Sequence, residues 1–176
     1  MKKDPTLYSI FIDELEDMLS CENQIIEALQ KMIKLASSED LIKAFSDHLE
    51  ETEIQVKRLE NIFSLLELPP KEKKCKGMEG ILKEGDEMFK GKTKDSLLDA
   101  ILISAAQKVE HYEIASYGTL RSFASQLDLD KEIVDLIQEN LKEEGAADKK
   151  LTKIADGSIF SDGINTQAAE PAKHKK

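Results

Sequence analysis

The chain has 176 residues, which is enough for one domain with a sizeable hydrophobic core. It contains 8 glycines, 4 prolines and no tryptophan, and it is rich in Leu, Ile, Glu, Lys and Ala, a composition typical of helical proteins. A formal net charge of -10 argues against nucleic-acid binding and makes cations the natural partners.

The first half of the chain predicts a helical hairpin. A helix is expected to begin after Pro5, capped by Asp4 or Thr6, and to run to about Ala36. The segment "SSED" predicts the start of a second helix, which is expected to end before the two prolines at 69–70. Because the connection is short, the two helices should be antiparallel neighbours. Their apolar stripes are Phe11, Leu15, Met18, Leu19, Ile25, Ile26, Leu29 and Ile33, and Leu41, Phe45, Leu49, Val56, Leu59, Phe63 and Leu66.

Residues 67–95 predict a long crossover with one short amphipathic helix around Met78, Ile81 and Leu82. Two further helices, at about 96–126 and 130–155, again have a short joint. The sequence thus predicts an all-α, ferritin-like four-helix bundle (residues 1–155) of two antiparallel helical hairpins. Residues 156–176 have no sustained helical period and are predicted to be a mobile tail whose removal changes the melting temperature little.

Four glutamates interrupt the apolar stripes of the four long helices. At about 100° per residue, Glu22, Glu113 and Glu144 fall on inner faces, and Glu53 falls at the edge of one. Glu113 follows Glu22 by 91 residues, and Glu144 follows Glu53 by the same 91. Two hairpins related by a pseudo-twofold axis would produce this spacing and place the four carboxylates at one height.

Buried carboxylates are costly without a cation, so the pattern predicts two divalent ions, for which carboxylate oxygens favour iron or manganese. The alternative is that these are ordinary helical glutamates near a core. His48 is expected close to an inner face. It could be a metal ligand, a hydrogen-bond partner of a ligand, or a core histidine whose hydrogen bonds are satisfied, and we interpret it as the last. His111 is interpreted as solvated, and Cys21 and Cys75 lack the spacing of a catalytic or metal-binding motif.

Five stretches resemble the bacterial ferritin-like stress proteins of the YciE/YciF type. They are "DELEDMLSCENQI", "HLEETEIQVKRLE", "KCKGMEGILKEG", "AAQKVEHYEIASYGTL" and "ENLKEEGAADKKLT", in order along residues 8–155. The resemblance implies a rubrerythrin-like bundle, a homodimer and a dinuclear metal site.

The resemblance also implies which residues hold the metals. Ferritin-like sites take one Glu from each of two helices, roles that Glu22 and Glu113 fill, and an E-x-x-H motif from each of the other two. Glu50 and Glu53 stand where the first E-x-x-H is expected, and Glu144 begins the second. Both histidines are absent; Glu53 replaces one and Asp148 is the candidate for the other. Glu110 adds a spare carboxylate, as in rubrerythrins.

The expected function is a dinuclear metal-binding carboxylate protein of the oxidative or general stress response, with iron the first choice and manganese the second. The residues leave open whether it is an enzyme, because both histidines and rubredoxin-type cysteines are missing. A non-catalytic helical bundle whose inner acids bind metal weakly or not at all is the alternative, and mineral storage is a third, weaker option. No secretory signal or span of about 20 apolar residues is present, so a cytoplasmic protein with no membrane association is expected.

Overall fold

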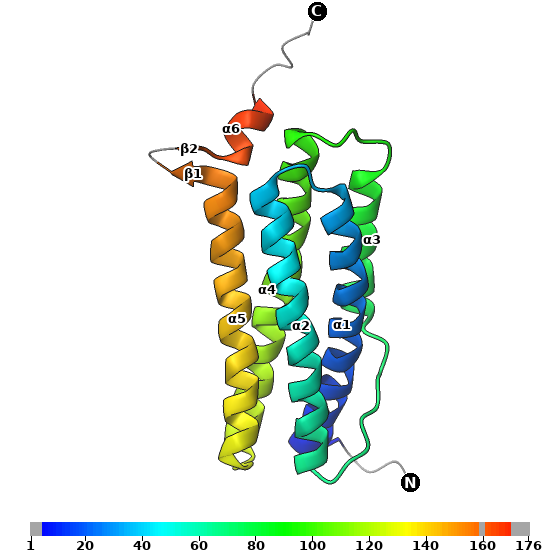
Figure 1. The fold of residues 1–176 in the computed structure, drawn as a ribbon. Coiled ribbons are helices and arrows are strands. Elements are labelled where there is room, and N and C mark those ends of the chain that lie inside the picture. Colours follow the sequence, from blue (N-terminus) through cyan, green and yellow to red (C-terminus); the bar gives the residue numbers. More distant parts are fainter. Residues whose placement is uncertain (1–4, 159–160, 170–176) are drawn as a thin grey trace, which may run out of the picture.

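Five α-helices of a computed structural model form an elongated bundle with a small appendage at one end (Figure 1). The structure describes residues 5–158 and 161–169. Four long helices pack side by side, and a short helix in the crossover lies against two of them. The predicted all-α bundle of two hairpins joined by a long crossover is confirmed.

The first hairpin comprises α1 (Leu7–Leu35) and α2 (Glu39–Leu65). Thr6 caps α1 through a capping box with Ser9, and Ser38 caps α2 by accepting from the Leu41 N–H. The turn between them is held from the second hairpin, because the carboxylate of Asp99 accepts from the N–H and hydroxyl of Ser37 and from the N–H of Ser38 at 2.5–2.9 Å.

The crossover contains α3 (Lys76–Phe89), and the second hairpin comprises α4 (Ser96–Gln126) and α5 (Lys131–Asp156). Cys75 caps α3, and the helix buries Met78 while Ile81 and Leu82 are half-buried against the core. The expected helix at 96–126 matches α4 end to end, and α5 lies within one residue of the predicted bounds at each end.

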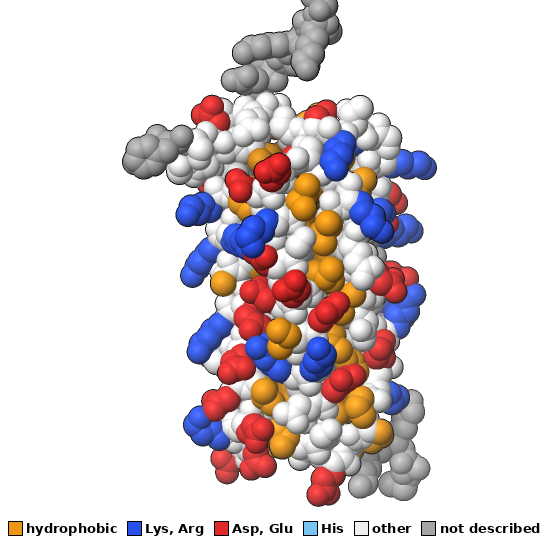
Figure 2. Space-filling model, viewed as in Figure 1, with side chains coloured by type: hydrophobic (Ala, Val, Ile, Leu, Met, Phe, Trp, Pro, Cys, Tyr) orange, Lys and Arg blue, Asp and Glu red, His pale blue; other side chains and the backbone are white. Residues whose placement is uncertain are grey.

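The visible face of the bundle carries an interrupted strip of hydrophobic side chains over α1 and α2, flanked by acidic and basic residues (Figure 2). Three large apolar side chains on these two helices are more than two-fifths exposed: Tyr8, Ile10 and Ile54. Among the described helices, none combines the length and apolar character that a membrane span requires.

The segment after α5 differs from the predicted mobile tail. Strands β1 (Gly157–Ser158) and β2 (Ser161–Asp162) pair antiparallel, and α6 (Ile164–Ala169) follows. Gly157 has a φ of +76°, and a Cβ there would lie 2.3 Å from the Gly163 nitrogen, so this tight return favours glycine. Ile164 is 4% exposed and belongs to the core. The sequence pattern gives no sign of this buried side chain, and the expected mobility of residues 156–176 stays a prediction. Residues 159–160 and 170–176 lie outside the described part.

Candidate metal centre

Five ionisable side chains from four helices meet inside the bundle. We call these residues the central cluster: Glu22 (α1), His48 (α2), Glu110 and Glu113 (α4) and Glu144 (α5). Each of them is at most 5% exposed. Helical phase brings them together, because each interrupts the apolar inner row of its helix. Within the cluster, His48, Glu110, Glu113 and Glu144 each offer a ligand atom within 4.8 Å of the others.

His48 stands between two carboxylates of the cluster. Its Nε2 lies 3.4 Å from Glu110 Oε1 and 3.6 Å from Glu144 Oε2, while Nδ1 lies 3.6 Å from Glu51 Oε2. These separations exceed normal hydrogen-bond lengths. A metal ion bound between them would lie close to both kinds of ligand, since imidazole nitrogen and carboxylate oxygen both coordinate iron and manganese.

Most polar atoms of the cluster have no hydrogen-bond partner among the described residues. These atoms are Glu22 Oε2, both nitrogens of His48, Glu110 Oε2, both oxygens of Glu113 and Glu144 Oε2. Within the same part of the chain, no lysine or arginine lies within 4 Å of these carboxylates. Fully ionised, the cluster would set four negative charges against one positive charge. Such a buried set needs protons or cations.

The pKa values reflect this arrangement. Burial, followed by repulsion from Glu144, raises the pKa of Glu22 to about 8. Burial also raises the pKa of Glu110 and Glu113 well above the ordinary carboxyl value, and raises that of Glu144. Burial opposes the charged form of His48, but the carboxylates of Glu110, Glu51 and Glu144 outweigh it and raise the pKa of His48 to about 10. Without metal, the cluster therefore retains protons at neutral pH.

A network of neutral and charged side chains orients two of the ligand candidates. Tyr117 donates to Glu22 Oε1, and Asn140 donates to Tyr117 Oη at 3.0 Å. Arg58 donates to Asn140 Oδ1 at 3.0 Å and pairs with Glu143 through two bonds of 2.6 and 2.9 Å. Gln55 then joins Glu143 to Glu144 Oε1. This chain of contacts fixes one oxygen of Glu22 and one of Glu144 and leaves the other oxygen of each free to coordinate.

A small cavity connects the cluster with the surface between α2 and α5. Its volume is about 80 Å³, and its walls include His48 and Glu110. The side chains of Glu51 and Lys150 at its rim are 47% and 45% exposed. A hydrated ion approaching from solvent would therefore meet the Glu51 carboxylate before His48.

The structure brings together three of the six metal ligands predicted from sequence: Glu22, Glu113 and Glu144. The other three are not part of this group. Glu50 and Glu53 are exposed on α2, so the expected inner-edge position of Glu53 is wrong. Asp148 is half-buried one turn after Glu144 and accepts from Gln107 Nε2 at 3.1 Å.

The rotation of α2 about its own axis explains why the position of Glu53 was predicted wrongly. Its buried inner row includes Phe45, His48, Thr52 and Gln55, spaced by three or four residues. A parallel row of half-buried apolar residues, Ile42, Leu49 and Val56, lies one position further along. When the second row is taken as the centre of the apolar stripe, Glu53 falls at the edge of that stripe, although it is exposed in the structure.

The structure adds His48 and Glu110 to the candidate ligands. His48 has no hydrogen-bond partner at either nitrogen among the described residues, so its interpretation as a satisfied core histidine is wrong. Its spacing of three from Phe45 and four from Thr52 is the signal that places it on the inner row. Glu110 lies one turn before Glu113 on the buried face of α4.

Comparison with known proteins agrees with this fold. A family model described as a domain of unknown function, DUF892, matches residues 6–168. Protein YciF of Escherichia coli K12 is 44% identical over 155 residues, which cover 88% of this chain and 93% of that protein. The crystal structure of the E. coli stress protein YciF has a TM-score of 0.80 at 44% identity, with 87% and 94% of the two chains covered. YcfI of Rhodopseudomonas palustris, proposed to be a structural protein, has a TM-score of 0.84 at 40% identity, with 88% and 99% covered. The predicted resemblance to the YciE/YciF type is thereby confirmed, and the chain belongs to the DUF892 family.

Proposed function

We propose that this protein binds two divalent metal ions in the central cluster, iron first and manganese second, and acts in a bacterial stress response. The observation that carries the proposal is a set of buried ligand atoms on five side chains from four helices, which have no hydrogen-bond partner in the described part of the chain. Two divalent ions carry the four positive charges that balance four carboxylates. The kinship with a protein described as a stress protein supports the biological setting.

The residues suggest a division of roles. Glu113, whose two oxygens have no hydrogen-bond partner among the described residues, would hold metal, and Glu22 and Glu144 would each offer the oxygen that their supporting bonds leave open. His48 and Glu110 would complete the ligand set on the side of the small cavity. With iron bound, the site would gain that metal's redox chemistry toward dioxygen or peroxide. The protein's part is to hold the ligands, exclude bulk water and retain or release protons at the carboxylates.

A second candidate is a structural bundle whose inner acids remain protonated or bind metal weakly. The description proposed for the R. palustris relative favours it. In a structural bundle of this kind, the raised pKa values would keep the buried carboxyl groups protonated and neutral, so the fold would not need metal.

Calorimetric titration of chelator-treated protein with Mn²⁺ under anaerobic conditions separates the two. We expect saturable binding of two ions per chain. Glu113→Gln should lose affinity for at least one of them, whereas the exposed Glu53→Gln, which removes the same charge from the surface, should bind as the wild type does. If Glu113→Gln and wild type bind Mn²⁺ equally, the assignment of Glu113 fails; if wild type shows no saturable binding, the structural reading is correct.

A further inference from the structure

The two cysteines of the chain meet at the contact between α1 and α3. Cys21 lies on α1, Cys75 is the N-cap of α3, and both side chains have no exposed surface. We propose that Cys21 and Cys75 are a thiol–disulfide redox pair, present as a dithiol until a small peroxide oxidises it to a disulfide between α1 and α3.

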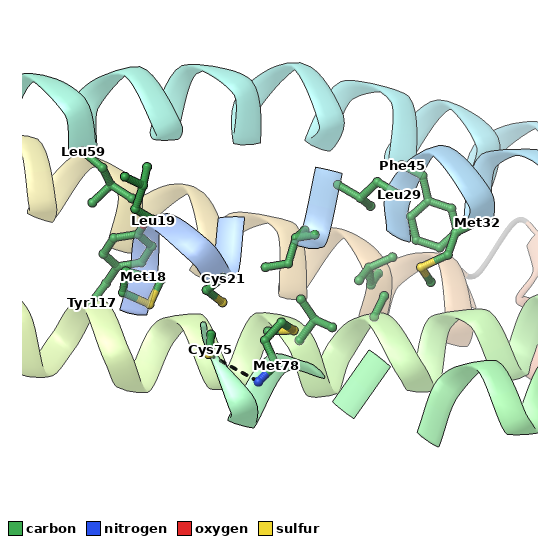
Figure 3. Packing of buried hydrophobic residues seen from close by; sticks show 14 of the residues in the cluster. Met18, Leu19, Cys21, Leu29, Met32, Phe45, Leu59, Cys75, Met78 and Tyr117 are labelled. Atoms are coloured by element: carbon green, nitrogen blue, oxygen red, sulfur yellow. Dashed lines mark hydrogen bonds between the residues drawn. The ribbon is translucent and has the colours of Figure 1, made fainter. Parts of the chain in front are cut away.

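Two hydrogen bonds fix Cys75 over the face of α1 that carries Cys21. The Cys75 N–H donates to Ser20 Oγ at 3.3 Å, and its carbonyl accepts from Gln24 Nε2 at 3.1 Å. Ser20 and Gln24 flank Cys21 in the sequence, so the anchors hold the two cysteines face to face. Figure 3 shows the two side chains close together where α1 meets the first turn of α3, near enough for the two thiols to interact. A disulfide requires the two Cβ atoms to lie this near to one another.

The surroundings of Cys75 favour its role as the attacking sulfur. Its Sγ accepts from the Met78 N–H at 3.4 Å in the first turn of α3 and lies 3.1 Å from Tyr112 Oη. Interaction with Cys21 is the largest effect that holds the pKa of Cys75 below its ordinary value. Tyr112 and Met78 lower this pKa further, whereas burial and Asp17 raise it. Thiols at helix N-termini are typically the reactive ones.

The chemistry balances with hydrogen peroxide as the oxidant. The Cys75 sulfur attacks one peroxide oxygen, the O–O bond breaks, and a sulfenic acid and one water are formed. The Cys21 sulfur then attacks the Cys75 sulfur, the S–O bond breaks, the S–S bond forms, and a second water leaves with the Cys21 proton. The two thiols together lose two electrons and two protons, and one peroxide becomes two waters. An external dithiol reverses the oxidation by exchange.

Packing around Cys75 restricts the oxidant to small molecules. The Tyr112 ring lies against the first turn of α3 so closely that a Cβ on Gly77 would be 2.7 Å from Tyr112 Cε2. Tyr112 and Gly77 therefore cover the sulfur together. Hydrogen peroxide is close to water in size, whereas an aromatic disulfide reagent is too large to reach either sulfur in the folded protein.

The test uses the full chain, reduced and kept in chelator so that metal plays no part. After treatment with hydrogen peroxide, the protein is quenched, unfolded, alkylated and analysed by peptide mass mapping. We expect loss of both alkylatable thiols, a cross-link between the Cys21 and Cys75 peptides within one chain, and recovery of both thiols on addition of dithiothreitol. In the folded reduced protein, the aromatic disulfide reagent should label neither thiol.

Two variants assign the roles of the sulfurs. In Cys21→Ser, Cys75 should stop at a sulfenic acid that dimedone traps, and in Cys75→Ser, Cys21 should stay reduced under the same peroxide dose. If a variant fails to fold, the peptide map of the peroxide-treated wild type still shows whether the disulfide forms. The proposal is overturned if peroxide leaves both wild-type thiols alkylatable, links cysteines of different chains, or carries Cys75 to sulfinic acid without a cross-link. Because the pair does not need metal, these outcomes are independent of Mn²⁺ binding.

Discussion

At the scale of single residues, Glu113 is the most informative position. It occupies the inner face of α4 where an apolar side chain would pack, it has no exposed surface, and neither oxygen has a hydrogen-bond partner among the described residues. A buried group in this condition destabilises the fold unless it holds a proton or a cation.

Replacing the Glu113 carboxyl group separates its effect on the stability of the metal-free fold from its contribution to metal binding. In chelator, Glu113→Gln should raise the thermal midpoint, because the amide keeps the volume and, unlike the carboxyl group, cannot become a further negative charge in the buried cluster. With Mn²⁺ added, the wild type should gain more stability than the variant. Glu53→Gln, exposed on α2, is the matched control and should follow the wild type in both conditions. Equal gains for wild type and Glu113→Gln would show that Glu113 is not a ligand.

The pH dependence of the metal-free protein follows from the raised pKa values. Glu22, with a pKa of about 8 in the fold against 4.5 when free, holds an extra proton between these values, so its contribution to stability is lost as pH rises. His48, raised from 6.5 to about 10, acts in the same direction from 6.5 upward.

Urea denaturation in chelator should therefore show a free energy of unfolding that falls between pH 5.5 and 8, by up to about 1.4 kcal/mol per pH unit for each extra proton. Excess Mn²⁺ should weaken or reverse the trend, because metal binding releases these protons. A metal-free protein that gains stability over this range would contradict the protonated state of the cluster.

The sequence is a good guide to the site wherever a helix has one apolar row. Glu22, Glu113 and Glu144 interrupt such rows, and helical phase alone places them inside. On α2, two adjacent rows compete, and the choice between them depends on how the helix is rotated against its neighbours. Only packing settles that rotation. It leaves Glu53 on the surface instead of at the inner edge, and it brings His48, expected near the inner face, among the carboxylates.

At the scale of elements, the ends of the long helices could be predicted because local chemistry sets them. Thr6, Ser38 and Asp95 accept from backbone N–H groups of the first turns of α1, α2 and α4. Helix α6 could not be predicted, because six residues with one buried apolar side chain produce no period.

Helix α6 should contribute to stability through Ile164. Ile164→Ala should lower the free energy of unfolding by about 2 kcal/mol, because it leaves a cavity at the end of the core. The exposed Thr166→Ala on the same helix serves as control in urea denaturation. If both variants match the wild type, the docking of α6 is not energetically coupled to the bundle.

The turn between α1 and α2 should depend on Asp99 from α4. Asp99→Asn keeps the shape but turns an amide toward the N–H groups of Ser37 and Ser38, so we expect a loss of about 1 to 3 kcal/mol in chemical denaturation. Asp130→Asn is a matched control, because Asp130 caps α5 without a side-chain hydrogen bond. Equal effects of the two changes would rule out a special role for Asp99.

At the scale of the whole molecule, the strip over α1 and α2 is the surface that we expect a homodimer to cover, and the dimer stays a prediction. Sedimentation equilibrium should give about twice the chain mass of 19.8 kDa. Ile54→Glu, exposed on α2, should shift the protein toward monomer, whereas Leu97→Glu, exposed on α4, should not. A wild-type mass of one chain would remove the basis for this interface.

Anomalous X-ray scattering tests directly whether the buried cluster of the bundle is a metal site. Crystals of protein purified without chelator would be measured on both sides of the iron and manganese absorption edges. We expect two anomalous peaks inside the bundle, between Glu22, Glu113 and Glu144 and beside His48 and Glu110. The absence of any peak in the cluster after soaking with Fe²⁺ or Mn²⁺, or peaks only at surface carboxylates such as Glu50 and Glu53, would show that the cluster is not a metal site.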